Sequence, residues 1–255
     1  MRTTDTVIDA EKCTGCGRCV KVCPSRTLEL RDGKAVVVGP ASLGCGHCEA
    51  ACPEGAVTVG FTDDAALDFA TFPLDRTWLA PGEYDTAGLA RLMASRRSCR
   101  NYADRLVDRA ALDDLVRFGT LAPSGTNSQE WTFTLFPDRA SVLKLGERVA
   151  AFFDRLVRLS RIAPLRIGMK IAGKPELHAF HRDYADDVEA GLREWRAGGK
   201  DRLFHGAPAV LLIGSRPGAS LPREDALLAS HNICLAAHAM GLGTCLTGFV
   251  VEAMK

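Results

Sequence analysis

Four cysteines near the start of the chain have types and spacing that suit the binding of an iron–sulfur cluster. Cys13, Cys16, Cys19 and Cys23 follow the pattern C-x2-C-x2-C-x3-C, and Pro24 comes directly after the last cysteine. Thiolates at this spacing, carried on a tight loop, hold a cubane of iron and sulfide. The first run therefore predicts chemistry with single electrons.

A second run repeats the pattern with one ligand missing. Cys45, Cys48 and Cys52 precede Pro53, and the residue at the position of the first cysteine of the pattern is Ser42. Three outcomes are open here: the serine oxygen ligates iron, the cluster has three irons, or the cluster is labile. A structural zinc site is the alternative, but the x2-x2-x3-C-P spacing is more specific than paired C-x2-C motifs.

Composition limits the class of protein. The chain has 255 residues, 47% hydrophobic content and a formal net charge of +1, which favours neither nucleic acid nor an anionic membrane as a partner. Seven of the ten cysteines fall in the two runs, so metal binding is favoured over disulfides. The N-terminus lacks the apolar stretch of a signal peptide, and the apolar run at 207–213 is too short to span a bilayer. We expect a soluble cytoplasmic protein.

Residues 1–60 form an internal repeat that predicts a small metal-centred domain. Each half offers a short strand, a cysteine loop, a short helix and a return strand, and Asp32-Gly33 marks the turn between the halves. So small a unit cannot build a large core, and clusters would fill its centre. The strands are expected at 7–8, 28–30, 35–38 and 57–59.

This repeat resembles the two-cluster bacterial ferredoxins. In that family the fourth cysteine of each run ligates the cluster of the other run. The resemblance implies two iron–sulfur clusters, the second being 4Fe-4S or 3Fe-4S with Ser42 in place of a cysteine. The complete 4Fe-4S cluster would be held by Cys13, Cys16, Cys19 and Cys52, and the second by Cys23, Cys45, Cys48 and Ser42.

Residues 61–85 are expected to be a linker, because prolines and a glycine interrupt a stretch without sustained periodicity. The stretch is too apolar for a free tether, so we expect it to lie against the second domain. Its large aromatic residues are Phe61, Phe69, Phe72 and Trp78.

Residues 86–255 are expected to form a second, α+β domain with helices packed around an antiparallel-rich sheet. Asp108 is expected to be the N-cap of a helix, and Gly241 is expected to end another. Helices are expected near 89–93, 108–116, 142–156 and 224–240, and strands at 131–136 and 209–213. Residues 137–205 form an insert that we expect to shape access of an acceptor.

Two polar segments of this domain suit a phosphate and a polar ring. Arg96, Arg97, Ser98 and Arg100 follow a helix, and arginine offers bidentate donors to anions. The loop 124–129 offers amide and hydroxyl groups. On residue types alone, a solvated basic corner and an ordinary turn remain the alternative.

In order along the chain, R-R-S-x-R and A-P-S-x-x-N-S-Q-x-W resemble the FMN-binding segments of the nitroreductase family, over roughly residues 86–250. The family usually has proline at the position of Glu130. The resemblance implies that backbone near the G-L-G-T-C turn, 241–245, approaches the flavin, as glycine permits. It implies these flavin contacts: Arg96, Arg97, Ser98, Arg100, Pro123, Ser124, Asn127, Gln129, Gly243 and Thr244.

The family normally continues beyond the glycine turn through a further helix, a strand and a basic residue that helps to hold the FMN phosphate. This chain stops at Lys255. We expect a fragment; the alternative is a phosphate site that relies on the arginines of 96–100.

Together these features predict an FMN-dependent oxidoreductase in which iron–sulfur clusters relay single electrons to FMN. The resemblance implies a homodimer, and as acceptor a small organic molecule such as a nitroaromatic, a quinone or an activated alkene. The donor is either a reduced ferredoxin-like protein or NAD(P)H. No side chain stands out as a catalytic acid or base. The alternative is a non-catalytic electron carrier or a redox sensor acting on a protein partner.

Overall fold

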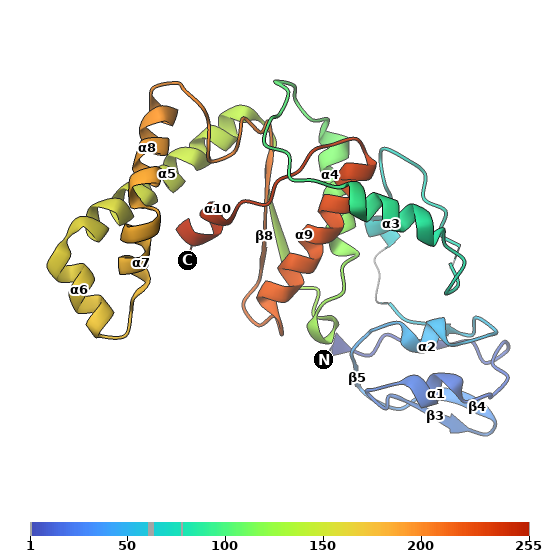
Figure 1. Ribbon diagram of the computed structural model, residues 1–255. Coiled ribbons are helices and arrows are strands. Elements are labelled where there is room, and N and C mark those ends of the chain that lie inside the picture. The colour runs from blue at the N-terminus through green and yellow to red at the C-terminus, as the bar shows by residue number, and fades with distance from the viewer. Residues whose placement is uncertain (1, 61–63, 78, 255) are drawn as a thin grey trace. The chain divides into compact units, whose positions relative to one another are not determined.

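The computed structural model describes residues 2–60, 64–77 and 79–254, and it is rich in helices with small antiparallel sheets (Figure 1). The α+β fold class predicted from the sequence is confirmed. None of the described helices combines the length and apolar character that crossing a bilayer requires. The chain forms two compact units: Met1–Tyr84, Asp113–Phe133 and Ile213–Ala236 make the first, and Asp85–Leu112, Thr134–Leu212 and Ala237–Lys255 the second.

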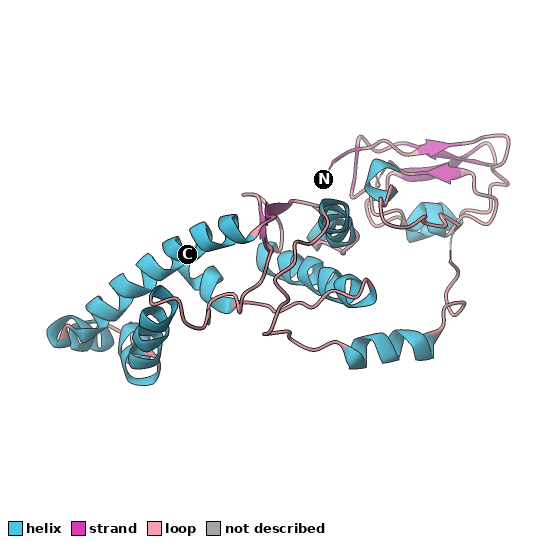
Figure 2. Cartoon of the chain, turned by 90° about the horizontal axis from the view of Figure 1, so that it is seen from above, coloured by secondary structure: helices cyan, strands magenta, loops and turns pink. Residues whose placement is uncertain are grey.

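The cysteine-rich repeat lies in the first unit, where its strands pair across the two halves. β1 pairs with β5 and β2 with β6, both antiparallel, so each half supplies a partner for the other. β3 and β4 form the central hairpin around Asp32 and Gly33; strands are magenta in Figure 2. The elements are β1 (Arg2–Thr3), β2 (Val7–Ile8), α1 (Arg18–Val22), β3 (Leu28–Arg31), β4 (Lys34–Val37), β5 (Ala41–Ser42), α2 (His47–Ala50) and β6 (Val57–Thr58).

Glycines shape both cysteine loops in the same way. Gly17 precedes α1 and Gly46 precedes α2, each with φ of 71°, in the left-handed region that favours glycine. A Cβ atom at Gly15 would stand 1.9 Å from the carbonyl oxygen of Gly33, so that loop tolerates no side chain there. The loops are thus closely packed and similar in backbone.

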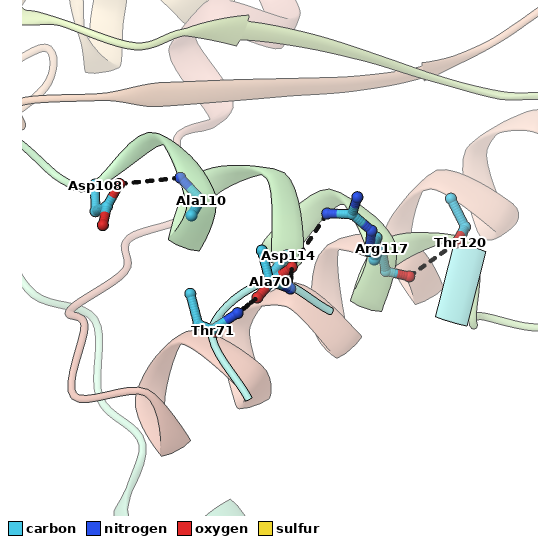
Figure 3. A network of polar contacts seen from close by, with 7 residues as sticks. All are labelled: Ala70, Thr71, Asp108, Ala110, Asp114, Arg117 and Thr120. Carbon is cyan, nitrogen blue, oxygen red and sulfur yellow. Dashed lines mark hydrogen bonds and ion pairs between the residues drawn. The ribbon is translucent and has the colours of Figure 1, made fainter. Parts of the chain in front are cut away.

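The segment that follows the repeat is fastened to α4 (Arg109–Thr120). Asp114, which is 0% exposed, accepts hydrogen bonds from the Ala70 N–H (2.9 Å), the Thr71 N–H (2.8 Å) and the Thr71 hydroxyl (2.6 Å) (Figure 3). Arg117 donates to the same carboxylate at 3.1 Å. The segment starts with the short 3-10 helix Asp64–Leu67.

Aromatic rings add to this attachment. Phe69 lies with its ring centroid 4.7 Å from that of Phe72 and 4.7 Å from that of Phe118 on α4. Phe69 and Phe72 are two of the aromatic residues expected to lie against residues 86–255; they contact Phe118, which belongs to the same compact unit as the segment. Phe61 and Trp78, also named for this role, lie outside the described residues.

Helices dominate the second unit and enclose its core. α5 begins with a capping box, in which Asp138 accepts from the Ser141 N–H and the Ser141 hydroxyl faces the Asp138 backbone. Val142, Val149 and Phe153 of α5 are buried together with Val250 of α10. Figure 1 shows α5 to α8 grouped together. The helices are α3 (Thr86–Ser95), α5 (Arg139–Arg161), α6 (Ala163–Ile171), α7 (Glu176–Asp183), α8 (Ala185–Arg196) and α10 (Gly248–Ala253).

The remaining strands and the last long helix match their sequence predictions in position. β7 (Trp131–Phe136) pairs with β8 (Val210–Ser215), and α9 (Pro222–Ala239) ends before Gly241, whose φ is 75°. Each residue of β8 is partly exposed. Among the described residues, β7 and β8 form a sheet of two strands. Such a sheet buries less of its surface than a wide sheet does.

Candidate iron–sulfur and flavin sites

Thiols from both cysteine runs gather in one group around Cys19. Burial raises the pKa of the Cys19 thiol, and the nearby charges of Cys52 and Cys13 raise it further. Cys52 belongs to the second run, so the group draws on both halves of the repeat. This grouping has the crossed arrangement that the ferredoxin resemblance implies for the complete cluster.

The second group centres on Cys48. Burial raises the pKa of its thiol, and the charges of Cys23 and Cys45 act in the same direction. Cys23 comes from the first run, so this group is crossed as well. Like charges that are brought together without a counter-ion cost free energy, and a cationic iron cluster would supply the missing positive charge.

Hydrogen-bond donors point at the sulfur atoms, as the ligand set of a cluster requires. The Ala35 N–H lies 3.4 Å from Cys13 Sγ and the Ala56 N–H lies 3.3 Å from Cys52 Sγ. Backbone N–H groups, first that of Ala35, lower the pKa of the Cys13 thiol against the opposing effect of burial. The donor set therefore fits thiolate ligands of an iron–sulfur cluster.

Ser42 stands where the fourth ligand of the second group is expected. It is 9% exposed, and its hydroxyl oxygen accepts a hydrogen bond from the Gly44 N–H at 3.1 Å. The Leu43 N–H donates to Ser25 Oγ at 3.2 Å, which fixes the same loop from the other run. A buried hydroxyl is thus present at the position of the missing thiol.

Among the described residues, no three histidine, cysteine or acidic side chains converge on the position of a single metal ion. A four-iron cluster bound by four cysteines has one thiolate for each iron, so its ligands surround the cluster. The two crossed groups are therefore candidates for clusters of this kind.

In the second unit, the structure joins two of the segments predicted to bind flavin. Ser98 and Thr244 form a parallel bridge, and the Cys99 N–H donates to the Thr244 carbonyl oxygen at 2.8 Å. A Cβ atom at Gly243 would lie 2.8 Å from Cys99 Cβ, so only glycine allows this approach. The segment after α3 and the glycine turn therefore form one surface.

The three arginines of this surface differ in what they contact. The Arg97 guanidinium donates to the carbonyl oxygens of Ala94 at 2.5 Å and Arg96 at 2.8 Å, and so stabilises the C-terminal end of α3. The side chains of Arg96 and Arg100 have no carboxylate partner within the described residues. These two remain available to an anion.

The loop 123–129 belongs to the first unit and has an unusual backbone. Thr126, Asn127 and Gln129 each have φ of 52°, although none of them is glycine. The Gln129 N–H donates to Ser124 Oγ at 3.0 Å and helps to close the loop. Non-glycine residues in this region cost of order 1 kcal/mol each and are often found at ligand sites.

Neighbouring elements hold the loop in this conformation. The Gly125 N–H donates to Asp225 Oδ1 on α9 at 2.8 Å, and Asp225 is only 2% exposed. The other carboxylate oxygen, Asp225 Oδ2, has no hydrogen-bond partner within the described residues, and neither has the indole N–H of Trp131. Buried polar atoms without partners favour a polar ligand beside them, so the surroundings of the loop fit a bound cofactor.

Sequence reasoning missed Asp225, and it also missed the partner of Asn127. The Asn127 amide donates to the carbonyl oxygens of Leu43 at 3.1 Å and Gly44 at 2.7 Å, in the second cysteine loop. Neither contact has a local signal, because each joins residues far apart in the sequence. Pro123 is exposed at the start of the loop and makes no polar contact through its ring.

A pocket of about 450 Å³ lies elsewhere in the second unit, between α5 and α8. None of the residues predicted to bind flavin lines it. The pocket is lined by Leu143, Glu147, Ala150, Trp195 and Arg196.

Comparison with known proteins identifies the larger part of the chain. The family model "Nitroreductase family" matches residues 93–253. The chain belongs to the nitroreductase family. A second model, "4Fe-4S dicluster domain", matches residues 5–53, which contain all seven cysteines of the two runs.

Curated relatives match shorter stretches. Ferredoxin-2 of Desulfomicrobium norvegicum is 57% identical over 30 residues, which are 12% of this chain and 51% of that protein. Ferredoxin-3 of Desulfocurvibacter africanus is 66% identical over 29 residues, 11% of this chain and 48% of that protein. A putative NADH dehydrogenase/NAD(P)H nitroreductase of Archaeoglobus fulgidus is 33% identical over 57 residues, 22% of this chain and 33% of that protein. The chain thus spans about half the length of these ferredoxins and a third of the archaeal protein.

Solved structures of nitroreductases are also similar. An FMN-dependent nitroreductase of Clostridium difficile has 25% identity and a TM-score of 0.40, with 62% of this chain and 59% of that chain covered. A nitroreductase with bound FMN from Bacteroides fragilis has 20% identity and a TM-score of 0.44, with 65% of this chain and 77% of that chain covered. The family assignment rests on the family model.

Proposed function

We propose that the chain is an FMN-dependent oxidoreductase in which iron–sulfur clusters relay single electrons to FMN for the two-electron reduction of a small organic acceptor. The observation that carries the proposal is that one chain joins two crossed cysteine groups to a nitroreductase-family segment. Clusters exchange one electron at a time, whereas flavin takes one or two. A chain with both cofactors can therefore convert a stream of single electrons into pairs.

The proposed ligands and domain limits are those expected from the sequence: a ferredoxin-type domain at 1–60, a linker at 61–85 and a flavin domain at 86–255. The complete 4Fe-4S cluster would use Cys13, Cys16, Cys19 and Cys52. The second would use Cys23, Cys45 and Cys48, with Ser42 as the remaining neighbour.

The residues of the flavin domain bind and orient; when bound, FMN supplies the redox chemistry. Arg96 and Arg100 would hold the phosphate or stabilise the anionic reduced ring, as preorganised donors stabilise an oxyanion. Ser98, Gly243 and Thr244 would line the cofactor on the same surface. The backbone and side chains of 123–129 would provide polar groups from the loop. A proton for the acceptor would come from solvent, because no side chain of either segment is an evident acid.

The proposed acceptors are nitroaromatics, quinones or activated alkenes, and the proposed assembly is a cytoplasmic homodimer. The proposed donor is a reduced ferredoxin-like protein or NAD(P)H. The archaeal relative is a putative NADH dehydrogenase/NAD(P)H nitroreductase, and similarity to it supports NAD(P)H as a donor.

The test is the content of iron, acid-labile sulfide and FMN per chain in protein isolated without oxygen. We expect about seven or eight irons and one FMN. About four irons with one FMN would mean that the second group holds no cluster. Iron without FMN would contradict the flavin proposal and favour a non-catalytic electron carrier.

Arg100→Ala should weaken FMN binding about tenfold or more, because a hydrogen bond to a charged group contributes about 1.5–3 kcal/mol. Iron content should stay unchanged, because the cysteine groups are in the other unit. Arg91→Ala on α3 is the matched control, since it removes the same charge from a neighbouring exposed position. Equal FMN affinity in the two variants, measured by fluorescence titration, would refute the role given to Arg100.

A redox sensor acting on a protein partner is the second candidate, and the buried Ser42 favours it. A cluster with one oxygen ligand or one ligand missing would be lost more readily than a complete cluster. Ser42→Cys should then slow the loss of iron in air. If the rate of iron loss and the assembly of the protein do not change, the sensor hypothesis has no basis.

A further inference from the structure

The hydrogen bonds of Asn127 join the loop predicted to line the flavin to the loop that carries Cys45. Its amide nitrogen donates to Leu43 O at 3.1 Å and to Gly44 O at 2.7 Å, directly before Cys45 in the sequence. These residues all belong to the first unit. A side chain with two donors thus holds two successive carbonyl groups of a cysteine loop.

The same cysteine loop is held from two further sides. Ser25 Oγ accepts from the Leu43 N–H, and Ser42 Oγ accepts from the Gly44 N–H. Gly44 has φ of 60° and is buried. Asn127 completes this set, because it satisfies the carbonyl groups of the two residues whose N–H groups the serines satisfy.

The flavin loop is itself fixed on the opposite side of Asn127. The Gly125 N–H donates to the buried carboxylate of Asp225 on α9 at 2.8 Å, and this bond anchors the loop so that it can support the cysteine loop. The Thr126 hydroxyl lies 2.6 Å from Ser220 Oγ, an exposed contact with a residue that precedes α9.

We propose that Asn127 is a positioning residue that holds the second cysteine loop against the flavin loop, so that the cluster of Cys23, Cys45 and Cys48 is the one that exchanges electrons with the flavin. This inference rests on the proposed function. Each transfer would move one electron from the reduced cluster to the flavin, and no covalent bond would be made or broken. The electrons come from a one-electron reductant of the reduced-ferredoxin class, and protons come from solvent.

Two substitutions separate the donor groups of Asn127 from its backbone conformation. Asn127→Asp keeps the shape but has no N–H groups for the two carbonyl oxygens, and Asn127→Gly keeps the left-handed backbone without a side chain. Ser220→Ala is the matched control, because it removes a hydrogen bond from the same loop without touching the cysteine loop.

Hydrogen–deuterium exchange at the amides of 43–45 and iron content are measured on the whole chain isolated without oxygen. Both Asn127 variants should exchange these amides about tenfold faster, because two hydrogen bonds are lost. The two Asn127 variants should also show a changed electron paramagnetic resonance spectrum for the reduced second cluster, or should lose the iron of that cluster. Ser220→Ala should have the same amide exchange, iron content and spectrum as wild type. Unchanged exchange and iron together with loss of FMN would assign the side chain to the flavin and overturn the inference.

Cys48→Ser tests whether electrons reach the flavin through the second cluster. With a reduced two-cluster ferredoxin as probe, the first cluster should still be reduced, whereas bleaching of the flavin should be lost. Normal flavin bleaching in Cys48→Ser, or a wild-type chain with only four irons, would overturn the proposal that the second cluster is the exit, that is, the cluster that passes electrons to the flavin. A wild-type chain without FMN would refute the proposed function, and the exit assignment with it, but the exchange and iron data would still test whether Asn127 holds the loop.

Discussion

Cys13→Ser should halve the iron content of the chain, from about eight to about four irons, because one complete cluster loses a ligand. Cys13 is buried, and its sulfur accepts a hydrogen bond from the Ala35 N–H, which lowers the pKa of the thiol. A serine hydroxyl in this place does not ionise near neutral pH and is a poorer ligand for iron. Reduction of the flavin by a one-electron donor should then slow, because the entry cluster is gone.

Loss of the cluster should also loosen the fold of the first 60 residues. Val57, Leu28 and Ala35 are buried beside Cys13 and Cys19 in one small core, and a unit of about 60 residues buries too little apolar surface to be stable on that alone. Metal binding contributes directly to folding in domains of this size. Limited proteolysis should therefore cut this part of the variant faster than wild type.

Cys234→Ala is the control for the iron content and for the rate of flavin reduction, because it removes a buried thiol that belongs to neither run. Its iron content and its rate of flavin reduction should equal those of wild type. Normal flavin reduction in Cys13→Ser, with iron reduced to about half, would mean that electrons do not enter through this cluster.

The sequence predicted structure best where the chemistry of a cluster requires a fixed spacing of its ligands, or where the signals of a helix are local. The spacing of the cysteine runs carries the resemblance to two-cluster ferredoxins, and that resemblance implied crossed groups; the structure brings Cys19 near Cys52 and Cys48 near Cys23. The helix of 108–116 was predictable because its N-cap and apolar face are local, and Asp108 indeed accepts from the Ala110 N–H. Family motifs located the flavin segments, whose contacts with flavin stay a prediction.

The sequence did not predict contacts between residues that lie far apart along the chain. β1 and β5 have two residues each, too few for any periodicity, and pair only because the repeat folds back on itself. Asn127 lies in a flavin-binding motif, yet its amide binds carbonyl groups of the second cysteine loop. Long or polar side chains of this kind are placed by tertiary packing, which a local pattern does not contain.

Asp114→Asn should lower the free energy of unfolding by about 3 kcal/mol at neutral pH, because it disrupts a buried, charged hydrogen-bond network. The carboxylate is fully buried on α4 and accepts from both Ala70 and Thr71 (Figure 3). Asparagine keeps the shape, but its NH2 group would face N–H and O–H donors instead of accepting from them. Urea unfolding followed by circular dichroism measures the difference.

The same carboxylate gives a dependence on pH with a definite sign. Burial raises the pKa of Asp114, but hydrogen bonds from Thr71 and Ala70 and the charge of Arg117 outweigh it, so the pKa lies below its ordinary value of 3.8. The ionised form is therefore favoured by folding, and its contribution is complete above the unfolded pKa and is lost as the pH falls through the folded pKa. The difference in free energy of unfolding between wild type and Asp114→Asn should be constant near neutral pH and should become smaller below about pH 4.

Asp108→Asn on the same helix provides the matched control for this prediction. Its carboxylate caps α4 at 3.1 Å from the Ala110 N–H, and asparagine caps helices about as well as aspartate. It should therefore cost well under 1 kcal/mol, far less than Asp114→Asn. If the two variants lose equal stability, or if the gap for Asp114→Asn stays constant into acid, the buried carboxylate does not fasten the segment 69–72 to α4.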